Sequence, residues 1–352
     1  MKTINVFILL GLMSIPVVLS AEPLMYVPSG DANDIVIIDL STDKITGRIG
    51  ELENAHGLSS SPNSDYLVAG SMRQNVPNEQ PQANKPEQVS EAEHKAHHVS
   101  NSNIDSDVAH SSFVSIVHPE HGHVMRRIEV RGLTHHTAVS PDGRTAVAVH
   151  SAAGGISVID LDKFQVIKTL KTGTAPNYAT FSSDGKRLYV SNAQPGTISE
   201  LDTDGWTKIR EINVGKDPEH IVISADGTKL FMVNVGDGTV TVVDLATGAV
   251  IQRYETGASP HGIDVSENGQ WLFVSSKDDE KLSRIDLVGN KIKSIELHPA
   301  PYHLEYVDSV EKLYVSSRKE PIIWVINPTT LEVISRINIG KGVAHQMVVR
   351  EE

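Results

Sequence analysis

Histidine is the residue type whose placement in this sequence suggests chemistry. The chain has 16 histidines and no cysteine, which excludes a thiolate nucleophile and any cysteine-ligated metal. Neutral imidazoles that converge in space are common ligands of zinc and copper. Seven of the histidines occupy related places in a repeat of about 41 residues: His56, His135, His136, His220, His261, His303 and His345. Their spacing predicts a metal site if the fold brings the repeats together.

The repeat itself reads as β-structure. Each unit contains a segment typical of a β-strand, such as residues 156–161 and 240–245, and a polar turn, such as residues 140–143 and 225–227. Each unit has four strand-length segments rich in Val, Ile and Thr, and no long amphipathic helix interrupts them. Seven such units predict an all-β fold, a seven-bladed β-propeller of four-stranded antiparallel blades.

The two ends of the chain complement each other. Residues 25–27, 35–40 and 45–49 supply three outer strands with no inner strand before them, and residues 343–349 supply an inner strand with nothing after it. We therefore expect the N- and C-terminal strands to share one blade, which closes the ring and removes exposed edges.

In a propeller, equivalent positions are related by rotation about the central axis, so the seven histidines should converge at one mouth of the channel. They precede or begin the innermost strand of six blades, and the remaining blade has Asn177 at this place. Because side chains alternate along a strand, His135 and His136 should not both point toward the axis.

Several phrases resemble the YVTN β-propeller repeats of exported bacterial and archaeal proteins. The resemblance rests on residues 138–143, 188–192 and 240–245 and extends over the mature chain except for residues 72–112. It implies the propeller fold and says little about function, because one fold supports many activities.

The histidines favour a protein that binds zinc or copper at the channel mouth and acts in metal handling, as a chaperone, buffer or sensor. The absence of cysteine disfavours a Cu(I) carrier and favours zinc or Cu(II). The expected partner is a periplasmic metal-transport or redox protein. No catalytic residue and no organic cofactor site is predicted, and whether the protein is an enzyme stays open.

Two alternatives remain. Histidines from successive blades resemble the arrangement in copper-cluster propellers such as nitrous oxide reductase, and one or two could serve as axial ligands as in haem-d1-binding propellers. This resemblance implies a copper- or haem-dependent periplasmic oxidoreductase. Asn177 and the lack of a cysteine-bearing domain depart from the copper pattern. The second alternative is a metal-free interaction scaffold whose histidines only pack.

Secondary metal candidates lie in two further segments. Residues 72–112, rich in polar residues, read as a mobile insertion between two strands of one blade, with His94, His97 and His98. The turn after His118 carries His121 and His123 at ligand-like spacing, on the opposite face.

The N-terminus and the composition bear on location and partners. Residues 1–21 combine Lys2, a short apolar run and small residues, which is typical of a signal peptide, so residues 22–352 should form an exported periplasmic protein without membrane insertion. With 31 basic and 44 acidic residues the net charge is -13, which disfavours nucleic acid as a partner. We expect a monomer.

Overall fold

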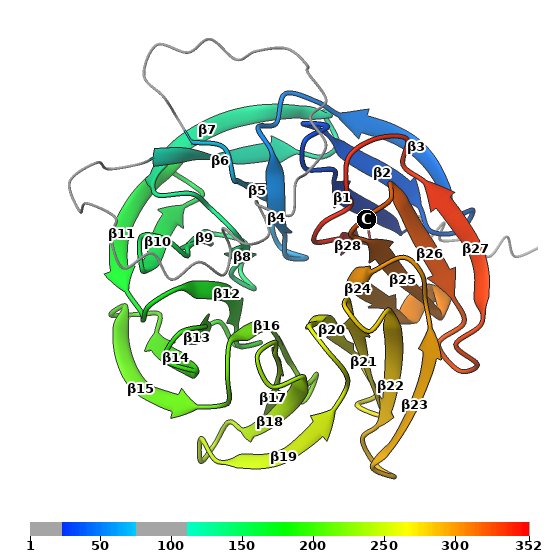
Figure 1. Ribbon diagram of the computed structural model, residues 1–352. Coiled ribbons are helices and arrows are strands. Elements are labelled where there is room, and N and C mark those ends of the chain that lie inside the picture. Colours follow the sequence, from blue (N-terminus) through cyan, green and yellow to red (C-terminus); the bar gives the residue numbers. More distant parts are fainter. Residues whose placement is uncertain (1–22, 75–110, 352) are drawn as a thin grey trace, which may run out of the picture.

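The computed structural model describes residues 23–74 and 111–351 and shows seven four-stranded antiparallel sheets arranged in a ring (Figure 1). The innermost strands are β28 (Val348–Arg350), β4 (Ala55–Ser59), β8 (Thr137–Val139), β12 (Pro176–Phe181), β16 (Pro218–Ile223), β20 (Pro260–Val265) and β24 (Pro301–Val307). The second strands are β1 (Leu24–Pro28), β5 (Leu67–Ser71), β9 (Thr145–His150), β13 (Arg187–Asn192), β17 (Lys229–Asn234), β21 (Trp271–Ser276) and β25 (Lys312–Ser317). The predicted propeller is confirmed.

The outer half of each blade follows the same order. The third strands are β2 (Ile35–Asp39), β6 (Ser111–His118), β10 (Gly155–Asp160), β14 (Thr197–Asp202), β18 (Thr239–Asp244), β22 (Lys281–Asp286) and β26 (Ile322–Ile326). The outermost strands are β3 (Lys44–Ile49), β7 (His123–Arg131), β11 (Gln165–Lys171), β15 (Thr207–Asn213), β19 (Val250–Glu255), β23 (Lys291–Glu296) and β27 (Val333–Asn338). Within the described ranges the single helical element is the 3-10 turn η1 (Asp308–Val310).

The ring closes as expected from the chain ends. Strand β28 pairs antiparallel with β1, with Met25 opposite Val349, so the N- and C-terminal strands share one sheet. The strand is shorter than the predicted 343–349, because the backbone before Val348 is irregular. The amide of His345 nevertheless donates a hydrogen bond to the carbonyl of Pro28 at 3.0 Å, which fixes this segment beside the first strand.

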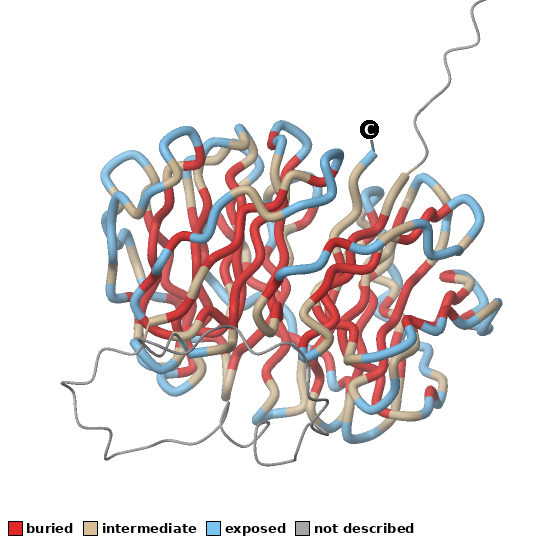
Figure 2. Tube along the Cα trace, turned by 90° about the horizontal axis from the view of Figure 1, so that it is seen from above, coloured by how far each residue is buried: buried red, intermediate tan, exposed pale blue. Residues whose placement is uncertain are grey.

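Burial follows the position of a strand in its blade. The second and third strands are buried on both faces because each blade is covered by its two neighbours, whereas outermost strands such as β11 are largely exposed. Trp324 of one blade and Phe273 of the next, both fully buried, belong to one such inter-blade core. Figure 2 shows these buried strands between exposed turns at the two rims. The result is a rigid frame around the axis.

Two predictions fall on residues outside the described ranges. The signal peptide at 1–21 and most of the insertion at 72–112, including His94, His97 and His98, lie there, so export to the periplasm stays a prediction. Among the described residues no helix has the length and apolar character needed to cross a bilayer.

Candidate functional site

The seven repeat-related histidines meet on the axis of the propeller. His56, His135, His136, His220, His261, His303 and His345, here called the histidine cluster, are each at most 6% exposed. Ring centroids of His56 lie 4.5 Å from His135 and 4.1 Å from His345, and those of His220 lie 4.2 Å from His261 and 5.0 Å from His303. The sequence predicted this convergence at the channel mouth, and in the structure the converging imidazoles are buried.

A recurring irregularity of the innermost strands aims these side chains. The ladder between first and second strand shifts register at the same place in five blades: between Ala55 and Leu58, Pro176 and Ala179, Pro218 and Ile221, Pro260 and Ile263, and Pro301 and Leu304. Each shift frees two residues, and His56, His220, His261 and His303 are among them. A bulge of this kind re-aims side chains and is common at functional sites.

The backbone before each bulge is held in an unusual conformation. Asn54, Ala175, Asp217, Ser259 and Ala300 all have φ between 44° and 52°, in the left-handed region that residues other than glycine rarely adopt. Each such residue costs about 1–3 kcal/mol unless the surroundings hold it, and strain of this kind gathers at functional sites. Five blades therefore have the same strained backbone conformation directly before the bulge.

Serine hydroxyls of the second strands satisfy the amides that the bulges release. Ser191, Ser275 and Ser316 accept hydrogen bonds from the amides of Tyr178, Gly262 and His303 at 3.0, 2.9 and 3.1 Å. These serines belong to the repeated phrase that carries the YVTN resemblance, for example at 188–192. Sequence reasoning missed this role, although the regular recurrence of serine after Val was a usable signal.

His135 and His136 both join the cluster, contrary to the expectation from strand alternation. Their ring centroids are 4.2 Å apart, and both have a ligand atom in one group with His56. The expectation was wrong because strand β8 begins only at Thr137, so the pair lies in irregular backbone.

Gly57 allows the blades to approach closely at this point. A Cβ at Gly57 would lie 2.5 Å from the Cα of His136 and 2.7 Å from the carbonyl oxygen of His135. We expect Gly57→Ala to lower the free energy of unfolding by about 1–3 kcal/mol, because backbone must move to relieve the overlap. Denaturant unfolding measures the effect. Gly50→Ala is the control, since its Cβ would meet nothing within 4 Å; equal stability of the two variants would contradict the prediction.

Neighbouring groups orient two of the imidazoles. His136 Nδ1 lies 2.9 Å from the carbonyl oxygen of Asn177, and His261 Nδ1 lies 3.0 Å from Oε2 of the buried Glu219. In the cluster His136 Nε2 lies 3.1 Å from His220 Nε2, so the two imidazoles contact each other directly. The blade that lacks a histidine thus contributes a carbonyl that orients the histidine of its neighbour.

Burial favours the neutral form of four imidazoles of the cluster. Burial lowers the pKa of His56, His136, His220 and His303 well below the usual value, and the neighbouring histidines lower it further. Nε2 of His303 and Nδ1 of His220 are buried without a hydrogen-bond partner in the described part of the chain. A buried polar atom without a partner is costly, and a bound cation would remove that cost.

The donor atoms form four overlapping groups. Each group has its ligand atoms within 4.8 Å of one another: His56, His135 and His136; His56, His303 and His345; His136, His220 and His303; and Glu219, His220 and His261. Three histidines around an open position are a donor set that suits zinc or copper. The groups of His56, His135 and His136 and of Glu219, His220 and His261 have no member in common, so the cluster offers donors for more than one ion.

The other candidate histidines do not join this arrangement. His118 stacks on His121 at 4.0 Å and His121 lies 5.9 Å from His123, but the described residues show no three-ligand group at this turn. His150 is bound to Ser157 Oγ at 2.8 Å, and burial lowers its pKa to about 4. The exposed His298 contacts Glu280 and Glu296.

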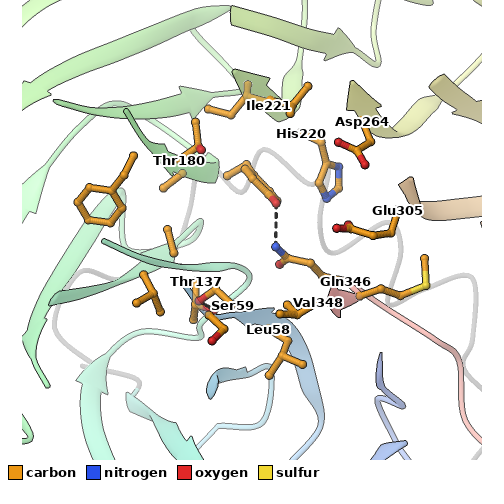
Figure 3. Close-up of a pocket in the computed structure, with 18 of the residues that line it drawn as sticks. Leu58, Ser59, Thr137, Thr180, His220, Ile221, Asp264, Glu305, Gln346 and Val348 are labelled. Atoms are coloured by element: carbon orange, nitrogen blue, oxygen red, sulfur yellow. Dashed lines mark hydrogen bonds between the residues drawn. The ribbon is translucent and has the colours of Figure 1, made fainter. Parts of the chain in front are cut away.

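A channel reaches the cluster from the side of the turns between first and second strands. Its cavity of about 430 Å³ is lined by His220 and His303 at the inner end and by residues such as Ser60 at the outer end. Figure 3 shows His220, Asp264, Glu305 and Gln346 around this cavity. Sequence reasoning missed Asp264, Glu305, Gln346 and Tyr178, because no local motif marks them.

Burial disfavours the charged form of two carboxyl groups in the channel. Burial raises the pKa of Asp264 to about 7, and burial together with Asp264 raises that of Glu305 well above its usual value. The Asp264 carboxylate accepts hydrogen bonds from the amides of Val265 and Tyr306, each at 2.8 Å. The pair thus holds fewer than two negative charges.

Fold and site together define a seven-bladed β-propeller with a buried polyhistidine cluster on its axis. The model of the family "Lactonase, 7-bladed beta-propeller" matches residues 150–256. No curated protein matches the sequence.

Solved structures share the fold at low sequence identity. The periplasmic gluconolactonase of Pseudomonas aeruginosa superposes with a TM-score of 0.67 at 14% identity, covering 93% of this chain and 99% of its own. Hydrazine synthase of Kuenenia stuttgartiensis superposes with a TM-score of 0.63 at 15% identity, covering 88% of this chain and 91% of its own. The dihydro-heme d1 dehydrogenase NirN superposes with a TM-score of 0.64 at 17% identity, covering 92% of this chain and 65% of its own.

These matches correct one expectation. The family model that matches residues 150–256 describes lactonase propellers, so the predicted role in metal handling, as a chaperone, buffer or sensor, is contradicted. The propeller part of the YVTN resemblance is confirmed by the seven blades. The finer assignment to YVTN repeats stays a prediction.

Proposed function

We propose that this protein is a metal-dependent hydrolase of the lactonase type whose reaction centre is zinc or copper held by the histidine cluster. The observation that carries the proposal is the set of overlapping buried histidine groups at the inner end of a channel. The match of residues 150–256 to the lactonase propeller family supports the reaction class.

The donor set fits this chemistry. When bound by three histidines with one open position, zinc polarises a carbonyl group and lowers the pKa of bound water to about 7. Burial keeps the imidazoles of His136, His220 and His303 neutral, as ligation requires. His220 and His303 line the channel, so the open side of this group faces the route by which a substrate enters.

Elemental analysis combined with a lactone assay tests the proposal. Purified protein should contain zinc or copper, should hydrolyse a lactone, should lose this activity after chelation and should regain it when metal is returned. Full hydrolysis by metal-free protein would refute the role of the metal. Metal-loaded protein with intense charge-transfer bands and no hydrolysis would refute the reaction class.

Glu219 provides a sharper test of how the cluster is held. Its carboxylate lies 3.0 Å from His261 Nδ1, and both side chains are at most 8% exposed. We expect Glu219→Gln to weaken the binding of an ion held by His261 about 10–100-fold, because a carboxylate on the far ring nitrogen orients the imidazole and raises its basicity. Competition with a chromophoric chelator measures the affinity. Glu296→Gln, at an exposed residue beside His298, is the matched control; an equal affinity in both variants would speak against the proposed role.

A further inference from the structure

The four ligand groups differ in how many of their members line the channel, and one group has two such members. His220 and His303 line the cavity, and both belong to the group with His136. The groups formed by His56 with His303 and His345, and by Glu219 with His220 and His261, each have one lining member. An ion at His136, His220 and His303 is therefore the one that a molecule in the channel meets first.

Tyr178 and Gln346 line the channel next to this group of histidines. The Tyr178 ring centroid lies 4.8 Å from those of both His136 and His220. Gln346 Nε2 donates a hydrogen bond of 2.7 Å to Tyr178 Oη, drawn as the dashed line in Figure 3. Since this bond uses a lone pair of the phenol oxygen, the phenol hydrogen is left to donate elsewhere.

The same pair also offers an acceptor. Gln346 Oε1 is buried and has no hydrogen-bond partner within the described ranges. A donor and an acceptor thus lie side by side in the channel, which suits a substrate carbonyl oxygen together with a water molecule.

The lining of the channel also restricts the charge of what can enter. Among the described residues that line the cavity there is no Lys or Arg, whereas Asp264 and Glu305 are present. The adjoining outer cavity, of about 780 Å³, adds Glu267, Asp308, Glu351 and one cation, Arg350. That guanidinium donates to Ser60 Oγ and to the carbonyl of Ser64 at 3.0 and 2.7 Å. Away from the proposed ion, the described side chains of the channel offer a phosphate or carboxylate no positive charge, and desolvation of the anion there is costly.

We propose that the substrate is a small uncharged lactone that enters through this channel and is bound by Tyr178 and Gln346 beside the ion at His136, His220 and His303. This inference rests on the proposed hydrolase function. Tyr178 donates its hydrogen bond to the lactone carbonyl oxygen, and Gln346 Oε1 accepts one from the attacking water. A cavity of about 430 Å³ accommodates a single-ring lactone.

The reaction is balanced without a further reactant. The water oxygen forms a bond to the carbonyl carbon, and the bond from that carbon to the ring oxygen breaks. One water proton passes to the released alkoxide, giving an alcohol, and the other is lost when the new carboxylic acid ionises. The carbonyl oxygen gains charge in the transition state, where the Tyr178 hydrogen bond becomes stronger.

The experiment uses the full chain loaded with zinc for rates and with cobalt for spectra. The substrates are δ-valerolactone, which is uncharged, and 6-phosphogluconolactone. We expect kcat/KM to be at least about 10²-fold higher for the uncharged lactone, and Tyr178→Phe to lower its kcat about 10²-fold at unchanged metal content. The uncharged lactam 2-piperidone, added to the cobalt protein, should shift the visible bands and should bind about tenfold more weakly to Tyr178→Phe.

A charge insertion provides the matched comparison. Thr180 lines the same cavity (Figure 3), so Thr180→Lys should raise the relative rate on the phosphorylated lactone, whereas Thr180→Gln, of similar length, should not. A metal-loaded lactonase that prefers the phosphorylated substrate, or that is indifferent to Tyr178→Phe in rate and lactam binding, would overturn this inference alone. Protein that binds no metal, or hydrolyses neither lactone, would overturn the proposed function itself.

Discussion

Replacing His136 and His303 together by alanine is expected to weaken metal binding by at least about 10³-fold. The two residues belong to three of the four ligand groups, so the double variant leaves only the group of Glu219, His220 and His261. Loss of two of three ligands removes about 4 kcal/mol or more of a binding free energy that is on the order of 10 kcal/mol for zinc in proteins.

Metal content and affinity measure this effect, with circular dichroism as the check on folding. His121→Ala with His123→Ala is the control, because this exposed turn lies outside the cluster. Retention of wild-type affinity by the cluster variant would show that neither His136 nor His303 holds the metal. Loss of affinity in the control would place a site at the turn instead.

The metal-free protein is expected to lose stability as the pH falls from 6.5 toward 5. Burial lowers the pKa of His56, His136, His220 and His303 in the folded state, whereas an unfolded histidine has a pKa near 6.5. Above this value the imidazoles are neutral in both states and contribute nothing to the pH dependence. Below it the unfolded chain binds protons first, so unfolding becomes easier by about 1.4 kcal/mol per pH unit for each histidine.

Two carboxyl groups act in the opposite direction. The pKa values of Asp264 and Glu305 are raised in the folded state, so over the same range the folded protein binds their protons first and gains stability as the pH falls. Burial also lowers the pKa of His150, to about 4. Five histidines therefore reduce the stability as the pH falls and two carboxyl groups increase it, so the net effect is a loss of stability.

Denaturant unfolding of chelated protein between pH 7 and 5 measures the slope. The variant with His136→Ala and His303→Ala should show a shallower slope, because two of the contributing imidazoles are gone. Stability that is constant over this range in the wild type would contradict the neutral, desolvated state of the cluster.

Much of the arrangement could be predicted from local patterns. The alternation of Val and Ile in segments such as 240–245 and the Asp-Gly turns indicate strands and hairpins through short-range chemistry, and their sevenfold recurrence implies a ring. Rotational symmetry then places His56, His220, His261, His303 and His345 near one axis without knowledge of any contact. The shared blade at the chain ends followed from counting strands, and β1 and β28 do pair.

Other features depended on contacts between blades. Whether His135 and His136 both join the cluster is decided by where β8 begins, and strand alternation alone suggested otherwise. The contact between Glu219 and His261 joins neighbouring blades, and the contact between Tyr178 and Gln346 spans residues 168 positions apart.

The sequence by itself thus determined the number of blades, the way the ring closes and the set of histidines that share one rotational position, since each follows from a short repeated pattern. Only the tertiary structure decided that the imidazoles are buried, that the bulges turn several of them inward and that one ligand group faces a channel whose described lining has no basic side chain. Burial, orientation and the local field at a side chain come from groups of several blades at once, and a pattern within one repeat does not contain them.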